Sequence, residues 1–74
     1  MNKDDELRQK IRNILIELRK EKGLTQTEVG DAVGKSLTAV ASWEQGLSLP
    51  DLSTLYKLSK FYDKPIAYMF GEEN

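Results

Sequence analysis

Residues 26–45 read QTEVGDAVGKSLTAVASWEQ, and this stretch decides the fold of the chain. Thr25, immediately before it, is a suitable helix N-cap, and Glu28 three residues later completes a capping box. A helix is therefore expected over Gln26–Val33. Gly34 follows at the point where the chain needs a left-handed residue in order to turn sharply. The stretch thus predicts a short helix and a tight turn, with a second helix after them.

The second helix of this stretch is expected over Leu37–Gln45. Ser36 is in place to cap its start, and Gly46 ends it. Val40 and Trp43 are three residues apart, so both side chains point to the inward side of the helix. The outward side then carries small, hydroxylic and apolar residues, namely Leu37, Thr38, Ala41 and Ser42. The pattern indicates a helix that is presented to something outside the protein.

The residues before this stretch predict a longer helix over about Asp5 to Glu21. Apolar side chains recur there at helical spacing and form one stripe, made of Leu7, Ile11, Ile14, Leu15 and Leu18. Acidic residues gather at its start and basic ones toward its end, which suits the helix dipole. Gly23 then stops this helix.

Two further helices are expected after residue 50. Pro50 and Asp51 open the first of them, with Asp51 as its cap, and Asp63 tolerates the turn that follows it. Its inward residues are predicted to be Leu52, Leu55, Leu58 and Tyr62. Pro65 begins a short last helix, whose Ile66, Met69 and Phe70 are expected to close the core. No run alternates with a period of two, so we predict an all-α fold of five helices, with one domain over 1–74 and an ordered core over about 5–70.

Composition excludes several classes of function. The chain of 74 residues has no cysteine and no histidine, which removes a disulfide framework, a zinc–thiolate site and a Ser-His-Asp arrangement. We therefore expect no enzyme, no metal and no cofactor. The first ten residues are charged and lack the apolar run of a signal peptide, and no apolar stretch approaches the ~18 residues of a membrane span. The expected location is the cytoplasm, away from membranes.

The net charge of −1 does not by itself indicate a nucleic-acid partner. Residues 1–22 carry seven basic and five acidic side chains, whereas residues 23–50 carry one basic residue, Lys35, and three acidic ones. The central helical stretch is therefore slightly acidic.

The chain from Gly23 to Phe70 resembles the Xre family of helix-turn-helix domains, which includes Cro and the lambdoid phage repressors. The resemblance is carried by GLTQTEVGDAVG, KSLTAVASWEQG and LPDLSTLYKLSKFYD at these spacings. It implies a five-helix, lambda-repressor-like domain with its helix-turn-helix unit over 26–45. The positions with a structural role in the family match Gly30, Gly34, Val40 and Trp43, together with an ion pair between Arg19 and Glu44. Gly30 satisfies the need for a side chain no larger than alanine where the two helices cross.

By the same resemblance, the second helix of the unit enters the major groove of DNA and reads base edges. The matching positions are Ser36, Leu37, Thr38, Ala41 and Ser42. This face carries no Arg, Lys, Gln or Asn before Gln45, so it lacks the side chains that read guanine or adenine in a bidentate manner. Hydroxyl hydrogen bonds and apolar contact with thymine methyl groups remain. Alternatively, Leu37 and Ala41 extend the core or a protein interface.

The residues expected to contact the DNA backbone are Gln26, Lys35, Gln45 and Ser48. Gln26 can donate its amide to a phosphate beside the free N–H groups of a helix N-terminus, or it is only a solvated polar residue. Lys35 either reaches a phosphate at the turn or lays its stem along the protein surface.

We therefore predict a sequence-specific regulator of transcription of the repressor type, which binds double-stranded DNA as a two-fold homodimer on a palindrome. Aromatic residues lie at helical spacing near the C-terminus, and most of them are expected in the core. One or two are candidates for the dimer contact, from among Tyr56, Phe61, Tyr62, Tyr68 and Phe70. The alternative is a helix-turn-helix scaffold that acts mainly through protein contacts, such as an antitoxin or an anti-repressor-type partner. The sequence leaves open whether the chain is a whole small regulator or the front domain of a larger one.

Overall fold

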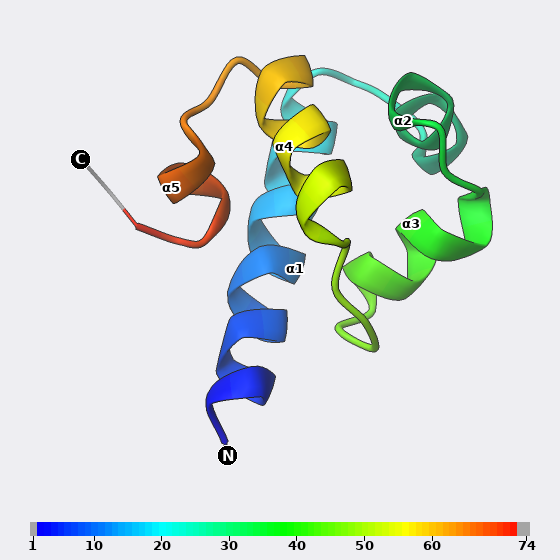
Figure 1. Ribbon diagram of the computed structural model, residues 1–74. Coiled ribbons are helices and arrows are strands. Elements are labelled where there is room, and N and C mark those ends of the chain that lie inside the picture. The colour runs from blue at the N-terminus through cyan, green and yellow to red at the C-terminus, as the bar shows by residue number, and fades with distance from the viewer. Residues whose placement is uncertain (1, 73–74) are drawn as a thin grey trace.

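Five helices follow one another along residues 2–72, which are the residues that the computed structural model describes (Figure 1). They are α1 (Lys3–Glu21), α2 (Gln26–Val33), α3 (Leu37–Glu44), α4 (Leu52–Phe61) and α5 (Ile66–Met69). No strand occurs within residues 2–72, and the predicted all-α fold of five helices is confirmed. None of the helices in this part of the chain is long and apolar enough to cross a membrane.

Side-chain caps explain where the first four helices begin. The capping residues are Asn2, Thr25, Ser36 and Asp51, and each accepts the backbone N–H three residues further on. The capping box predicted before α2 is present, because Thr25 and Glu28 each accept the other's backbone N–H, at 3.1 and 2.8 Å. Two predicted helix bounds were wrong by one or two residues. The Asn2 cap lets α1 begin at Lys3 instead of Asp5, and α3 ends at Glu44 because Gln45 is its C-cap.

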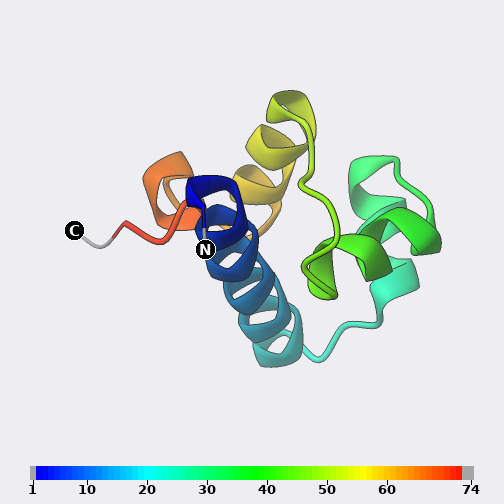
Figure 2. The same cartoon turned by 90° about the horizontal axis from the view of Figure 1, so that it is seen from below.

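The core lies where α1 meets the other helices. Helix α3 packs against α1 and α2, while α5 packs against α1 and α4. In both views α2 and α3 lie on one side of α1, and α5 lies on the other (Figures 1 and 2). The buried apolar residues form one cluster of Ile11, Leu15, Leu18, Val29, Val33, Val40, Trp43, Leu55, Leu58, Tyr62 and Met69. The long helix therefore carries the helix-turn-helix unit on one flank.

Two residues that were predicted to face the core are exposed. Leu52 is 73% exposed and Ile66 is 38% exposed. Both are the first residue of their helix, α4 and α5 respectively. Helical spacing gives the direction in which a side chain leaves the helix axis, but not how far the neighbouring helices extend along that axis. At these two helix ends the neighbouring helices do not extend far enough to cover the side chains.

The turn between α2 and α3 depends on two glycines. Gly34 has a φ of +72°, the left-handed conformation that the sequence predicted at this position. At Gly30, the Cβ of an alanine would lie 2.4 Å from the carbonyl oxygen of Lys35 and 3.4 Å from Cγ2 of Val40. The expected size limit of alanine at Gly30 was therefore too large, since an alanine there would require the backbone after the turn to move. This close approach sets how tightly α3 folds back on α2.

Candidate nucleic-acid interface

Two buried side chains set the rotation of α3 about its own axis. Val40 is 1% exposed and Trp43 is 5% exposed, as predicted for the inward side. Leu37 and Thr38 are exposed on the opposite side, and Ala41 is half-buried. Figures 1 and 2 place α3 at the outer edge of the molecule, on the flank away from α5. The outward face of α3 is therefore accessible to a large partner.

A shallow, open hollow of about 480 Å³ lies along this face of α3. It is lined by Gln26, Leu37, Thr38, Ala41, Ser42, Gln45 and Leu47. None of these seven residues carries a charge. Four of the five predicted base-reading residues and two of the four predicted phosphate contacts therefore come together here. Hereafter this set of seven residues is called the reading hollow.

Leu47 is the member of the reading hollow that the sequence reasoning missed. It is 70% exposed and lies in the loop between α3 and α4. The position of Leu47 follows from the left-handed turn at Gly46, whose φ is +74°, and from the bond between the Leu47 N–H and the Ser42 carbonyl oxygen, 3.0 Å long. The sequence signal that could have indicated Leu47 was a large apolar residue directly after Gly46, the glycine that ends the helix.

Two hydroxyl groups predicted to contact DNA are hydrogen-bonded to each other. The Oγ atoms of Ser42 and Ser48 are 2.7 Å apart. Ser48 itself does not line the reading hollow. The pair fastens the loop after α3 to the helix. It uses one of the two O–H donors, and the accepting hydroxyl keeps its own hydrogen for a base edge or a phosphate.

The predicted ion pair between Arg19 and Glu44 is present and is bidentate. Nε of Arg19 lies 2.8 Å from Oε2 of Glu44, and Nη2 lies 2.8 Å from Oε1. Arg19 also donates from Nη1 to the carbonyl oxygen of Leu24, at 3.0 Å. A third partner was not anticipated, since the side-chain amide of Gln26 donates to Oε1 of Glu44 at 3.1 Å. The carboxylate thus joins the end of α1, the start of α2 and the end of α3.

The electrostatics of this network favour the charged pair. Burial works to raise the pKa of Glu44, but the hydrogen bonds from Arg19 and Gln26 outweigh it and hold that pKa below its ordinary value. The hydrogen bond to Glu44 raises the pKa of Arg19. Burial, with the charge of Glu44 close by, raises the pKa of Tyr62 to about 12, so its phenol stays protonated. The network keeps a charged carboxylate beneath α3 without an unpaired buried group.

The other predicted contacts lie outside the reading hollow. The Oγ of Ser36 accepts the N–H of Ala39 at 3.1 Å, so this oxygen is used in capping α3. The Nζ of Lys35 is 3.7 Å from Oδ2 of Asp51, and both side chains are exposed. An exposed pair of this kind contributes little to stability, so the ammonium group is free to exchange Asp51 for a phosphate.

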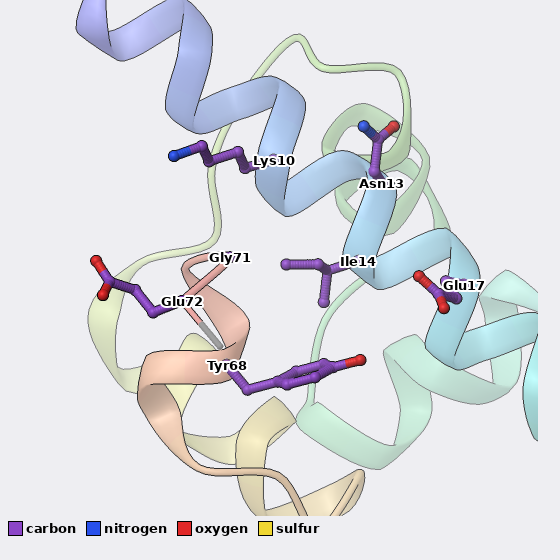
Figure 3. A pocket seen from close by; sticks show the side chains of 7 residues that line it. All are labelled: Lys10, Asn13, Ile14, Glu17, Tyr68, Gly71 and Glu72. Carbon is purple, nitrogen blue, oxygen red and sulfur yellow. The ribbon is translucent and has the colours of Figure 1, made fainter. Parts of the chain in front are cut away.

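A second hollow, of about 320 Å³, lies between α1 and α5 and is separate from α3 (Figure 3). Its lining is Lys10, Asn13, Ile14, Glu17, Tyr68, Gly71 and Glu72. The ring of Tyr68 lies opposite Ile14, and charges of both signs surround it. Within residues 2–72 there is no group of three or more side chains that could hold a metal ion.

Comparison with known proteins places this geometry in a family. A family model described as helix-turn-helix matches residues 15–69. The chain is 38% identical over 56 residues to the cryptic phage CTXphi transcriptional repressor RstR of Vibrio cholerae, an alignment covering 76% of the chain and 50% of that protein. It is also 37% identical over 60 residues to the HTH-type transcriptional activator BcrR of Enterococcus faecalis, covering 80% of the chain and 29% of that protein.

The chain belongs to the Xre-type helix-turn-helix family, as the resemblance of residues 23–70 predicted. It spans about half the length of the repressor and less than a third of the length of the activator.

Proposed function

We propose that this chain binds double-stranded DNA in a sequence-specific manner and regulates transcription, with α3 in the major groove. The observation that carries the proposal is the reading hollow, an accessible face of α3 whose rotation is set by buried Val40 and Trp43. Two relatives named as a transcriptional repressor and a transcriptional activator support the same class of function. Base edges would meet Leu37, Thr38 and Ala41.

Contacts to the DNA backbone would come from the start of α2 and from the two ends of α3. The Gln26 amide uses one N–H on Glu44, which orients the side chain and leaves its second N–H for a phosphate. Lys35 would add the one positive charge of the helix-turn-helix unit. Gln45 and Ser48 would add neutral hydrogen-bond donors. Because charged contacts are few, we expect the affinity to fall only modestly with salt, by about 0.9 log units per log unit of salt for each phosphate neutralised.

The experiment that tests this function is a selection of tight-binding duplexes from a random pool, followed by a salt titration of the winners. We expect a palindromic consensus with half-sites about 10 bp apart, together with a shallow salt slope. A pool that shows no enrichment even at low salt would contradict the proposal.

A palindrome requires contact between two copies of the chain, and we propose that the face between α4 and α5 supplies it. Three exposed large hydrophobic side chains lie there, those of Leu52, Tyr56 and Ile66, along an open groove of about 630 Å³. The groove is also lined by Lys60 and Lys64, whose ammonium groups lie over the rings of Tyr56 and Tyr68, at 5.3 and 4.9 Å. An apolar centre with a polar rim is the usual composition of a dimer interface.

Tyr56→Glu should weaken the binding of a full palindrome by at least about tenfold, because a carboxylate would be buried at the centre of the contact. Binding of a single half-site should not change, and Tyr56→Phe, which keeps the ring, should resemble the parent. Fluorescence anisotropy on both duplexes measures the two affinities. Equal affinity of parent and Tyr56→Glu for the palindrome would mean that the copies meet elsewhere.

A second candidate function is supported by one observation, the lack of charge in the reading hollow. The same face could bind a protein rather than DNA, with Leu37 and Leu47 as apolar anchors. Failure of the selection, together with loss of a protein partner in Leu37→Glu, would favour this alternative.

A further inference from the structure

We propose that the reading hollow recognises the 5-methyl groups of thymine, and that Leu47 and Leu37 are its principal specificity-determining residues. This inference rests on the proposed DNA-binding function and names the chemical feature that the function would read. Three observations support it: the hydrogen-bonding groups already partly engaged near α3, the apolar side chains left exposed there, and the chemistry of the major groove.

Several hydrogen-bonding groups near α3 are already partly engaged within the protein. Ser42 and Ser48 share one hydrogen bond, the Ser36 oxygen accepts the N–H of Ala39, and one N–H of the Gln26 amide is held by Glu44, so each of these groups has only part of its bonding capacity left for DNA. Within the reading hollow, the Thr38 hydroxyl and the Gln45 amide carry no such bond among those found in residues 2–72. Gln45 is the C-cap of α3, whereas base edges are read mainly from the N-terminal part of a recognition helix. A single threonine hydroxyl makes neither bidentate pattern that identifies guanine or adenine.

Apolar surface is present where those bonding groups are lacking. Leu37, the first residue of α3, is 50% exposed, and Leu47, beyond the end of α3, is 70% exposed. Half-buried Ala41 also lines the hollow. The other exposed large hydrophobic side chains of residues 2–72 lie on the α4–α5 face. The apolar groups on this flank therefore face the space that a base edge would occupy.

Of the four standard bases, only thymine presents a methyl group in the major groove. An uncharged hollow with two exposed leucines gains most by covering such a methyl with a side chain and excluding water. The same contact is available to 5-methylcytosine, whose methyl occupies the corresponding position on a different hydrogen-bonding pattern. The ligand class is thus a duplex with 5-methylpyrimidines opposite Leu37 and Leu47.

The test starts from a duplex enriched by the selection. Each thymine of one half-site is replaced in turn by deoxyuridine, which removes only the methyl group, and affinity is measured by fluorescence anisotropy. We expect one or two positions at which the dissociation constant rises about fourfold, the effect of exposing one buried methyl. At those positions, replacing the thymine–adenine pair with a 5-methylcytosine–guanine pair should weaken binding less than replacing it with an unmethylated cytosine–guanine pair. Deoxyuridine in the flanking sequence serves as the control for altered duplex properties.

Two protein variants assign the contact to its side chain. In Leu37→Ala and in Leu47→Ala the deoxyuridine effect should disappear at one position each, while Gln45→Ala should bind more weakly and keep the effect. Circular dichroism verifies that the variants are folded. An enriched duplex that tolerates deoxyuridine everywhere would overturn this inference and leave the DNA-binding proposal intact. Persistence of the effect in both leucine variants would overturn the assignment to these residues, and a selection without enrichment would overturn the DNA-binding function itself.

Discussion

Replacing Trp43 with alanine is expected to lower the free energy of unfolding by about 3–5 kcal/mol. Trp43 is buried in the apolar cluster that residues 2–72 form, on the side of α3 that packs against α1 and α2. Removal of the indole side chain exposes apolar surface to water. It also leaves a cavity that the short helices α2 and α3 cannot close by moving together. A domain of this size has a total stability of about 4–11 kcal/mol. The variant should therefore lose a large part of its stability, and with it the fixed rotation of α3.

Urea unfolding followed by circular dichroism measures this loss, because the chain has a single tryptophan and its fluorescence disappears with the substitution. Trp43→Phe should cost about 1–2 kcal/mol, since most of the apolar contact is kept. Leu47→Ala, at a site 70% exposed, is the matched control and should change stability by no more than about 0.5 kcal/mol. An unfolding midpoint of Trp43→Ala close to that of the parent would show that α3 is held by other contacts.

The parts of the fold that the sequence predicted well are those that depend on neighbours along the chain. A cap and its N–H acceptor are three residues apart, so Thr25 with Glu28, or Asp51 before α4, can be recognised from spacing alone. The left-handed turn at Gly34 is local in the same way. Burial of Val40 and Trp43 follows from their helical spacing together with the family pattern. These features position α3, so most of the reading hollow could be predicted.

The features that the sequence did not predict depend on residues distant along the chain or on where a layer ends. Gln26 meets Glu44 across 18 positions, so its amide could not be assigned in advance to Glu44 rather than to solvent. The exposure of Leu52 depends on how far the neighbouring helices reach, which no spacing encodes. Leu47 enters the hollow because the chain turns at Gly46, and a loop residue has no helical period that would reveal its direction.

The ion pair beneath α3 gives the second large effect. Arg19→Met should lower the free energy of unfolding at pH 7 by about 3 kcal/mol, because it leaves the Glu44 carboxylate buried without its main donors. Side-chain exposure is 6% for Glu44 and 17% for Arg19, so water cannot fully replace the guanidinium. Gln26 would remain as a single neutral donor. Urea unfolding of the parent and the variant gives the difference.

The pH dependence separates this cause from simple loss of packing. In the parent, the pKa of folded Glu44 lies below its unfolded value of about 4.3, so the stabilisation is complete above that pH and is lost as the pH falls through the folded pKa. In Arg19→Met the opposing effect of burial dominates, and the folded pKa should rise above the unfolded value. Protonation of Glu44 at low pH then removes the cost of its buried, unpaired charge in the variant. The difference in unfolding free energy between parent and variant should therefore narrow from pH 7 to pH 4. A gap that does not vary with pH would assign the loss to the packing of the arginine stem.

A double variant shows whether the pair stabilises the fold or mainly fixes its arrangement. Arg19→Met/Glu44→Leu removes both charges, and its cost should be well below that of Arg19→Met alone, because no buried charge is left unpaired. The affinity of the double variant for DNA should nevertheless fall, since residue 44 no longer joins α1, Gln26 and the end of α3. We expect a double variant that is nearly as stable as the parent yet binds the selected duplex at least tenfold more weakly, as measured by anisotropy. Parent-like affinity in that variant would mean that apolar packing around Trp43 is enough to orient α3.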